Sequence, residues 1–176
     1  LKSSTLESYN TYGQLVQGRD ANSTPITTKY SYNSAVPVAS FQNATDNQST
    51  VSVFDDNDAS LWFGSYGTWT IENGVYRQTN GSVTETWNIP RVSTGAYIDD
   101  ATLEADIRFD NAGNYRYAGI AKSVNPSNYV TFELRKSESV VRIMAMMGGA
   151  YAYTDAAFTC NELQWYHVKG VIQGQT

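Results

Sequence analysis

Apolar and polar residues alternate with a period of two through the second half of this chain. In ATLEADIRF (101–109) every odd position is apolar, and every even position is polar or charged. In NYVTFELR (128–135) the even positions from 130 onward are apolar and the odd positions are mostly polar. Successive side chains of an extended strand point to opposite faces, so this pattern predicts half-buried β-strands. The segments 139–147 and 164–174 are predicted to be strands of similar length.

Clusters of Gly, Asn, Pro and Ser separate the predicted strands, for example at 110–114 and 125–128. A strand about every 10 to 15 residues, with turn signals between, is typical of an antiparallel β-sandwich or jelly roll. The dipeptide Asn73-Gly74 predicts a further hairpin, because both central residues of a type I′ turn need positive φ. We therefore expect an all-β fold with almost no helix.

Composition excludes some classes of partner and location. The formal net charge is −5 and no basic run occurs, which argues against nucleic-acid binding. No apolar run approaches the roughly 18 residues that would predict insertion into a membrane. Only 16% of residues are charged, and Ser, Thr, Asn, Gly and Tyr are abundant, as in many secreted proteins. We expect an extracellular or cell-surface location.

Aromatic residues and the single cysteine carry weaker predictions. Trp69 and Trp165 lie inside strand patterns, so we expect both in the core. Cys160 is the only cysteine, which excludes an intramolecular disulfide and a zinc site built on paired cysteines. We expect it to be a small, half-buried residue.

The first 35 residues differ from the rest of the chain. They contain two tyrosine-centred strand patterns around Tyr-Gly and Asp-Ala-Asn turns, and a polar, loop-like segment follows. The predicted organisation is a β-hairpin segment over 1–35, a linker over 36–49 and a β-sandwich domain over 50–176.

The order of strand, Asx turn and tyrosine motif in the first segment is specific enough to compare with a known repeat. The motif residues are Tyr9-Asn10, Tyr12-Gly13-Gln14-Leu15, Asp20-Ala21-Asn22 and Tyr30-Ser31-Tyr32-Asn33. This order resembles the YD (Rhs-type) repeat of bacterial wall-associated and toxin proteins, with asparagine in place of aspartate at two positions. The resemblance implies further YD repeats of the same protein as partners, because repeat units need stacked neighbours.

The remaining residues follow a second, dispersed pattern. Its parts are Val53-Phe54-Asp55-Asp56, Trp62, Gly67-Thr68-Trp69, Asn73 to Tyr76, Ala101 to Arg108, Ala118-Gly119-Ile120, Tyr129 to Arg135 and Trp165 to Lys169. The pattern is similar to that of concanavalin A-like, laminin G-like jelly rolls of the levanase-type carbohydrate-binding modules. In such domains a few more strands follow the last motif, so we expect this chain to hold a jelly roll that is incomplete at its C-terminus.

A candidate ligand site lies on the polar side of the predicted strand 128–135. Tyr129, Thr131, Glu133 and Arg135 combine aromatic rings with planar hydrogen-bonding groups, which sugar recognition requires. Arg116 is expected on the neighbouring strand, beside Glu133 in one register. A solvated sheet face with cross-strand ion pairs is the alternative reading. The resemblance favours a glycan or cell-wall polysaccharide as the ligand.

Catalysis is not expected. Glycosidases need two carboxylates, and Glu104 and Asp106 share one strand face at a suitable spacing of about 7 Å. However, Phe109 stands where jelly-roll glucanases of the Glu-x-Asp-x-x-Glu type carry glutamate.

One acidic cluster raises the question of a metal. Asp55, Asp56 and Asp58 could bind a structural calcium, which takes six to eight oxygen ligands. The cluster lacks the spacing of an EF-hand loop, and an Asx-rich turn is the simpler explanation.

Taken together, the sequence predicts a non-catalytic, extracellular carbohydrate-binding or adhesion module of a bacterial YD-repeat surface protein. Two alternatives stay open. The first is a structural spacer or plug domain of a YD-repeat shell that makes protein contacts only, and the second is a glycoside hydrolase.

Overall fold

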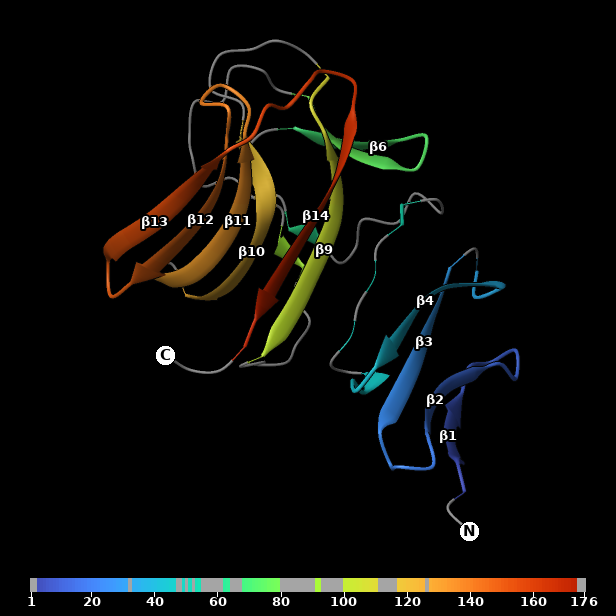
Figure 1. The fold of residues 1–176 in the computed structure, drawn as a ribbon. Helices are drawn as coiled ribbons and strands as arrows, with labels where there is room; N and C mark the ends of the chain where they lie inside the picture. The colour runs from blue at the N-terminus through green and yellow to red at the C-terminus, as the bar shows by residue number, and fades with distance from the viewer. Residues whose placement is uncertain are drawn as a thin grey trace. The chain divides into compact units, whose positions relative to one another are not determined.

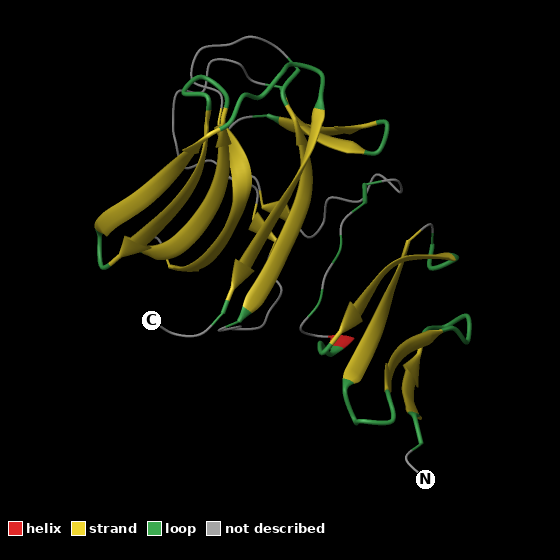
Figure 2. Cartoon of the chain, viewed as in Figure 1, coloured by secondary structure: helices red, strands yellow, loops and turns green. Residues whose placement is uncertain are grey.

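The described part of the chain is mostly β-strand, and every strand pair within it is antiparallel (Figures 1 and 2). The computed structural model describes residues 3–31, 33–46, 49, 51, 53–54, 62–63, 68–79, 91–92, 100–110, 117–125 and 127–173. The chain divides into two compact units, Leu1–Ala96 and Tyr97–Thr176. Within the described ranges no helix is long and apolar enough to cross a membrane. The predicted all-β class is confirmed.

The first unit begins with a four-stranded antiparallel sheet in chain order. Its strands are β1 (Thr5–Tyr9), β2 (Leu15–Arg19), β3 (Pro25–Ser31) and β4 (Val36–Gln42). The first two connections use the same side-chain chemistry. The Oδ1 atoms of Asn10 and Asp20 each accept hydrogen bonds from the backbone amides two and four residues later, at 2.8–3.0 Å. These bonds satisfy backbone donors that a tight turn would otherwise leave unpaired.

Strand β4 corrects the predicted linker over 36–49. Its residues pair with β3 from Ile26↔Gln42 to Ser31↔Val36, so the segment 36–42 belongs to the sheet. The linker was predicted because the sequence of this segment is polar and loop-like, as the exposed residues of an edge strand can also be. Pro37 lies in β4, which is at the edge of the sheet, where a missing backbone N–H can face solvent.

The predicted hairpin around Asn73-Gly74 is confirmed. Strands β6 (Trp69–Glu72) and β7 (Val75–Gln78) pair directly across it, and its two residues have φ of 52° and 72°. The ring of Tyr76 stacks on Trp69 and on Phe54, with centroid distances of 5.0 and 5.2 Å. Burial in this cluster raises the pKa of the Tyr76 phenol. A second short pair joins β5 (Trp62–Phe63) to β8 (Arg91–Val92).

The second unit contains a four-stranded sheet and a two-stranded sheet. The strands of the larger one are, in order, β10 (Tyr117–Asn125), β11 (Asn128–Arg135), β12 (Val140–Met147) and β13 (Ala150–Ala157). The smaller sheet pairs β9 (Ala101–Arg108) with β14 (Trp165–Ile172). The burial of β9 alternates along its whole length, as its sequence predicts.

A small apolar core fills the space between these two sheets. Its buried members are Phe109, Leu134, Cys160 and Val168, with Ile107, Ala118, Ile120, Phe132, Val141 and Tyr166 packed around them. Phe132 and Leu134 of β11 therefore point into the core, as predicted. The backbone of β14 lies directly on the ring of Phe132, because a Cβ added at Gly170 would be 2.5 Å from that ring.

Trp165 is not in the core, contrary to the prediction. The residue is 46% exposed on the outer face of β14, and the guanidinium of Arg108 lies 4.9 Å from its ring centroid. Trp165 shares its strand face with His167 and Lys169, so the alternation in β14 places it outward with them.

Candidate functional site

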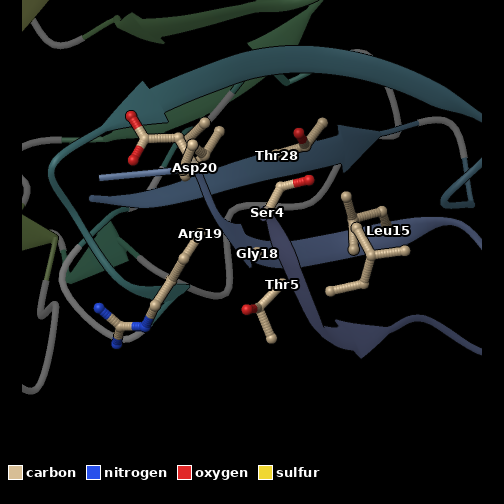
Figure 3. A pocket seen from close by; sticks show the side chains of 10 residues that line it. Ser4, Thr5, Leu15, Gly18, Arg19, Asp20 and Thr28 are labelled. Atoms are coloured by element: carbon tan, nitrogen blue, oxygen red, sulfur yellow. The ribbon is translucent and has the colours of Figure 1, made fainter. Parts of the chain in front are cut away.

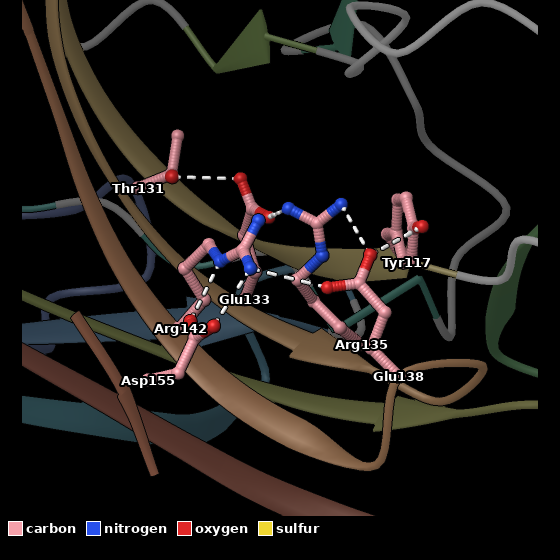
Figure 4. Close-up of polar contacts among 7 residues, drawn as sticks. All are labelled: Tyr117, Thr131, Glu133, Arg135, Glu138, Arg142 and Asp155. Carbon is pink, nitrogen blue, oxygen red and sulfur yellow. Dashed lines mark hydrogen bonds and ion pairs between the residues drawn. The ribbon is translucent and has the colours of Figure 1, made fainter. Parts of the chain in front are cut away.

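The four residues predicted on β11 lie on the sheet face opposite to the apolar core. The strand register joins them to residues of the three other strands of the same sheet. We call this surface the polar face, and define it by Tyr117, Tyr129, Thr131, Glu133, Arg135, Arg142, Met144, Tyr151, Tyr153 and Asp155, with Glu138 from the β11–β12 turn. Figure 4 shows seven of these side chains, from all four strands, converging on one network.

Two arginines and three carboxylates form the centre of the polar face (Figure 4). Arg142 binds both oxygens of Asp155, at 2.7 Å each. Glu138 bridges the two arginines, with its Oε1 2.9 Å from Arg135 and its Oε2 3.1 Å from Arg142. Arg135 also lies 3.3 Å from Glu133. This network holds five charged groups in fixed positions, with Glu133, Arg135 and Arg142 half-buried and Glu138 and Asp155 more exposed.

Aromatic rings flank the ion network. The guanidinium of Arg135 lies 3.7 Å from the ring centroid of Tyr117, and that of Arg142 lies 4.0 Å from that of Tyr153. Tyr153 and Tyr151 have nearly parallel rings, with centroids 6.4 Å apart. These two tyrosines are 55% and 65% exposed, so they offer aromatic surface to a ligand beside the charged groups.

Thr131 and Tyr129 continue the polar face along β11. Thr131 is only 3% exposed, and its hydroxyl donates a 2.7 Å hydrogen bond to Glu133. The pKa of the Tyr129 phenol is raised, first by burial and then by the negative charge of Glu133. Thr131 therefore helps to fix the Glu133 carboxylate, and Tyr129 stays neutral at physiological pH.

Hydrogen bonding within the network fixes the charge state of Asp155. The bond from Arg142 is the main reason that the pKa of Asp155 is lowered, and the same pairing raises the pKa of Arg142. A carboxylate with a depressed pKa stabilises the folded state above its unfolded pKa of about 3.9, and this contribution disappears as the pH falls through the folded pKa.

Replacing Asp155 with asparagine tests this assignment. The variant is expected to be less stable than the parent at pH 7, because Arg142 loses a charged partner. The difference should shrink as the pH falls below about 4, where the parent's carboxylate becomes protonated. Urea unfolding curves at several pH values measure this, and a difference that is independent of pH would contradict the assignment.

Several predicted site residues lie outside the described part of the chain. These are Arg116 and the candidate calcium ligands Asp55, Asp56 and Asp58. The described residues contain no cluster of three or more His, Cys, Asp or Glu that could hold a metal ion. The position beside Glu133 on β10, where Arg116 was expected in one register, is held by Gly119.

The acidic pair on β9 is part of a separate, exposed ladder. Glu104 lies 2.6 Å from Lys169 and 3.5 Å from His167, and Asp106 lies 2.9 Å from His167. The hydrogen bond from Lys169 lowers the pKa of Glu104. A general acid of a glycosidase needs a raised pKa, so Glu104 is poorly suited to protonate a leaving group.

A hollow of about 290 Å³ lies on the first sheet of the other unit (Figure 3). It is lined by Ser4, Thr5, Leu6, Leu15, Gly18, Arg19, Asp20, Ala21, Ile26 and Thr28. Its charged side chains are used locally: Arg19 pairs with Glu7 at 2.6 Å, and Asp20 caps its own turn. The gathering of ion pairs and exposed rings distinguishes the polar face from this mainly apolar hollow.

Sequence reasoning found the residues of β11 but missed their partners. Arg142, Glu138 and Asp155 complete the ion network, and Tyr151 and Tyr153 supply the exposed rings. Alternation in β12 could have placed Arg142 on one face with Met144. Strand β13 was not predicted at all, so no sequence pattern pointed to Tyr151, Tyr153 or Asp155 as residues of the site.

Comparisons with protein-family models, with curated proteins and with solved structures find no match for this chain. The class of protein is therefore defined by the structure alone, as an all-β antiparallel sandwich with a charged and aromatic face.

Proposed function

We propose that the second unit is a non-catalytic carbohydrate-binding or adhesion module that contacts glycan through the polar face. The observation that carries the proposal is the pair of exposed rings, Tyr151 and Tyr153, beside the fixed ion network of Arg135 and Arg142. Binding would be by shallow contact, and no bond would be broken.

Sugar chemistry explains why these groups suit a glycan. A sugar ring has an apolar face of C–H groups, which packs well on an aromatic ring. Its hydroxyls can both donate and accept hydrogen bonds, so they can bind carboxylates and guanidiniums that are already oriented. In the polar face the ion pairs hold these groups in place before the ligand arrives, which reduces the ordering cost of binding.

The wider context rests on the sequence resemblances. The similarity to levanase-type carbohydrate-binding modules supports a glycan or cell-wall polysaccharide as the ligand. The similarity of the first segment to YD repeats supports a bacterial surface protein as the host and further YD repeats as neighbours. Both resemblances and the composition support an extracellular location.

One observation favours a second function, that of a structural spacer with protein contacts only. Both arginines of the network already have carboxylate partners, as a purely structural sheet face would require. A spacer needs no ligand, so the two functions differ in what they predict for the exposed tyrosines.

The test compares glycan binding by the parent chain with that of two tyrosine variants. Tyr151→Ala is expected to weaken binding about tenfold, because it removes an exposed ring from the polar face. Tyr12→Ala is the matched control, since Tyr12 is 68% exposed in a turn of the other unit. A glycan array followed by calorimetry on the positive glycan measures the effect. An array without any positive glycan would favour the spacer.

A further inference from the structure

The edge of the four-stranded sheet at β13 is the most exposed regular element of the second unit. All eight residues of β13 are exposed, on both faces of the strand. β13 pairs with β12 at every position from Val140↔Ala157 to Met147↔Ala150, without a bulge. None of the described strands pairs with the other edge of β13, and Figure 1 shows β13 as the outermost strand of its sheet.

Natural proteins normally protect such an edge. Lysine, proline, a bulge or a short strand prevents pairing with another chain, and an inward-pointing charge does the same. β13 reads AYAYTDAA, is eight residues long and contains neither lysine nor proline. Its one charged residue, Asp155, is held by both of its oxygens on Arg142 of the neighbouring strand. The edge is therefore regular and free of every one of these protections.

We propose that β13 pairs antiparallel with β13 of a second copy of this chain, and that the two four-stranded sheets join into one continuous sheet. The inference does not depend on glycan binding. The pairing would follow a two-fold axis perpendicular to the sheet.

The side chains of β13 suit pairing with an identical strand. On the side of the core, Ala150, Ala152, Thr154 and Ala156 are small, so two copies can approach without steric obstruction. On the polar face, Tyr151 and Tyr153 would meet their counterparts, and aromatic cross-strand pairs are favourable. Two copies of Asp155 would not repel strongly, because Arg142 compensates each carboxylate.

The partner must also resemble β13 in charge. A strand rich in lysine or arginine would find only the compensated Asp155 as a countercharge along this edge, and a strand rich in acidic residues would find no cation within β13. An uncharged strand of small and aromatic residues is the best complement, and β13 is such a strand. An interface of eight-residue strands is small, so we expect a reversible dimer rather than an obligate one.

Sedimentation of the full chain over a range of concentrations tests the proposal. The parent is expected to change from monomer to dimer as its concentration rises. Ala152→Lys and Ala156→Lys should each weaken dimerisation by about tenfold or more, because each adds one lysine per copy, and so two like charges, to a short interface that has no other lysine. The control is Thr102→Lys, which adds the same charge at an exposed position on β9.

A mixing experiment keeps the test independent of any loss of folding. Ala152→Lys and Ala152→Glu chains should each be monomeric alone, and an equimolar mixture should recover the dimer because its interface carries opposite charges instead of like ones. Near-ultraviolet circular dichroism confirms that each chain is folded. The proposal is overturned if the parent stays monomeric at every concentration, or if its dimer survives both lysine substitutions.

Discussion

Leu134→Ala is expected to lower the free energy of unfolding of the second unit by about 3 kcal/mol. Leu134 is 4% exposed in the core between the two sheets, so its removal leaves a cavity as well as losing buried apolar surface. Urea denaturation measures the effect as a lower midpoint at an unchanged slope.

The matched control for Leu134 is Ile143→Ala. Ile143 is on the same side of the same sheet, directly opposite Phe132, but it is 47% exposed. We expect its truncation to cost less than about 1 kcal/mol, because β9 and β14 do not bury it. Equal losses for the two variants would mean that the core does not lie between the sheets as described.

Gly119→Ala is the second substitution with a large expected effect, a loss of about 2 kcal/mol or more. A methyl group at this position would overlap the backbone carbonyl oxygen of Phe132 and lie 3.0 Å from the Cα of Glu133. Both obstacles belong to the backbone of β11, so no side-chain rotation can relieve the clash. β10 would have to move away from β11, and the polar face would change shape with it.

Two controls separate this clash from other effects. Ser123→Ala changes an exposed residue of the same strand and should be nearly neutral. Gly148→Ala has open space around the new methyl group but a φ of 57°, so only backbone strain of roughly 1 kcal/mol is expected. If Gly119→Ala were no worse than Gly148→Ala in thermal unfolding, the close approach of β10 and β11 would be in doubt.

The strands that could be predicted from sequence are those with one buried face. The predicted strand 128–135 coincides with β11, and β9 ends one residue before the predicted limit, because burial of one face forces alternation. β13 was not predicted because both of its faces are exposed. Its sequence therefore lacks the alternation of buried apolar and exposed polar residues that indicates a half-buried strand. It is also rich in alanine, a weak strand former.

The candidate site could be predicted only along a single strand. Tyr129, Thr131, Glu133 and Arg135 share a face by parity alone, which any reader of the sequence can derive. The partners Arg142 and Asp155 depend on how β11, β12 and β13 align, and a shift of one residue would send them to the other face. The prediction for Trp165 was wrong for a related reason. Its position inside a strand pattern suggested burial, but its parity with His167 placed it on the exposed face of β14.

The pairing of β9 with β14 has a consequence for biosynthesis. The partners Arg108 and Trp165 are separated by almost 60 residues, whereas the strands of the first sheet follow one another directly. At a translation rate of 5–20 residues per second, β9 would leave the ribosome about 3 to 12 s before its partner exists. Hairpins such as β1–β2 close within microseconds. The first sheet can therefore form during translation, while the edge of β9 that pairs with β14 has no partner strand from β14 until β14 emerges.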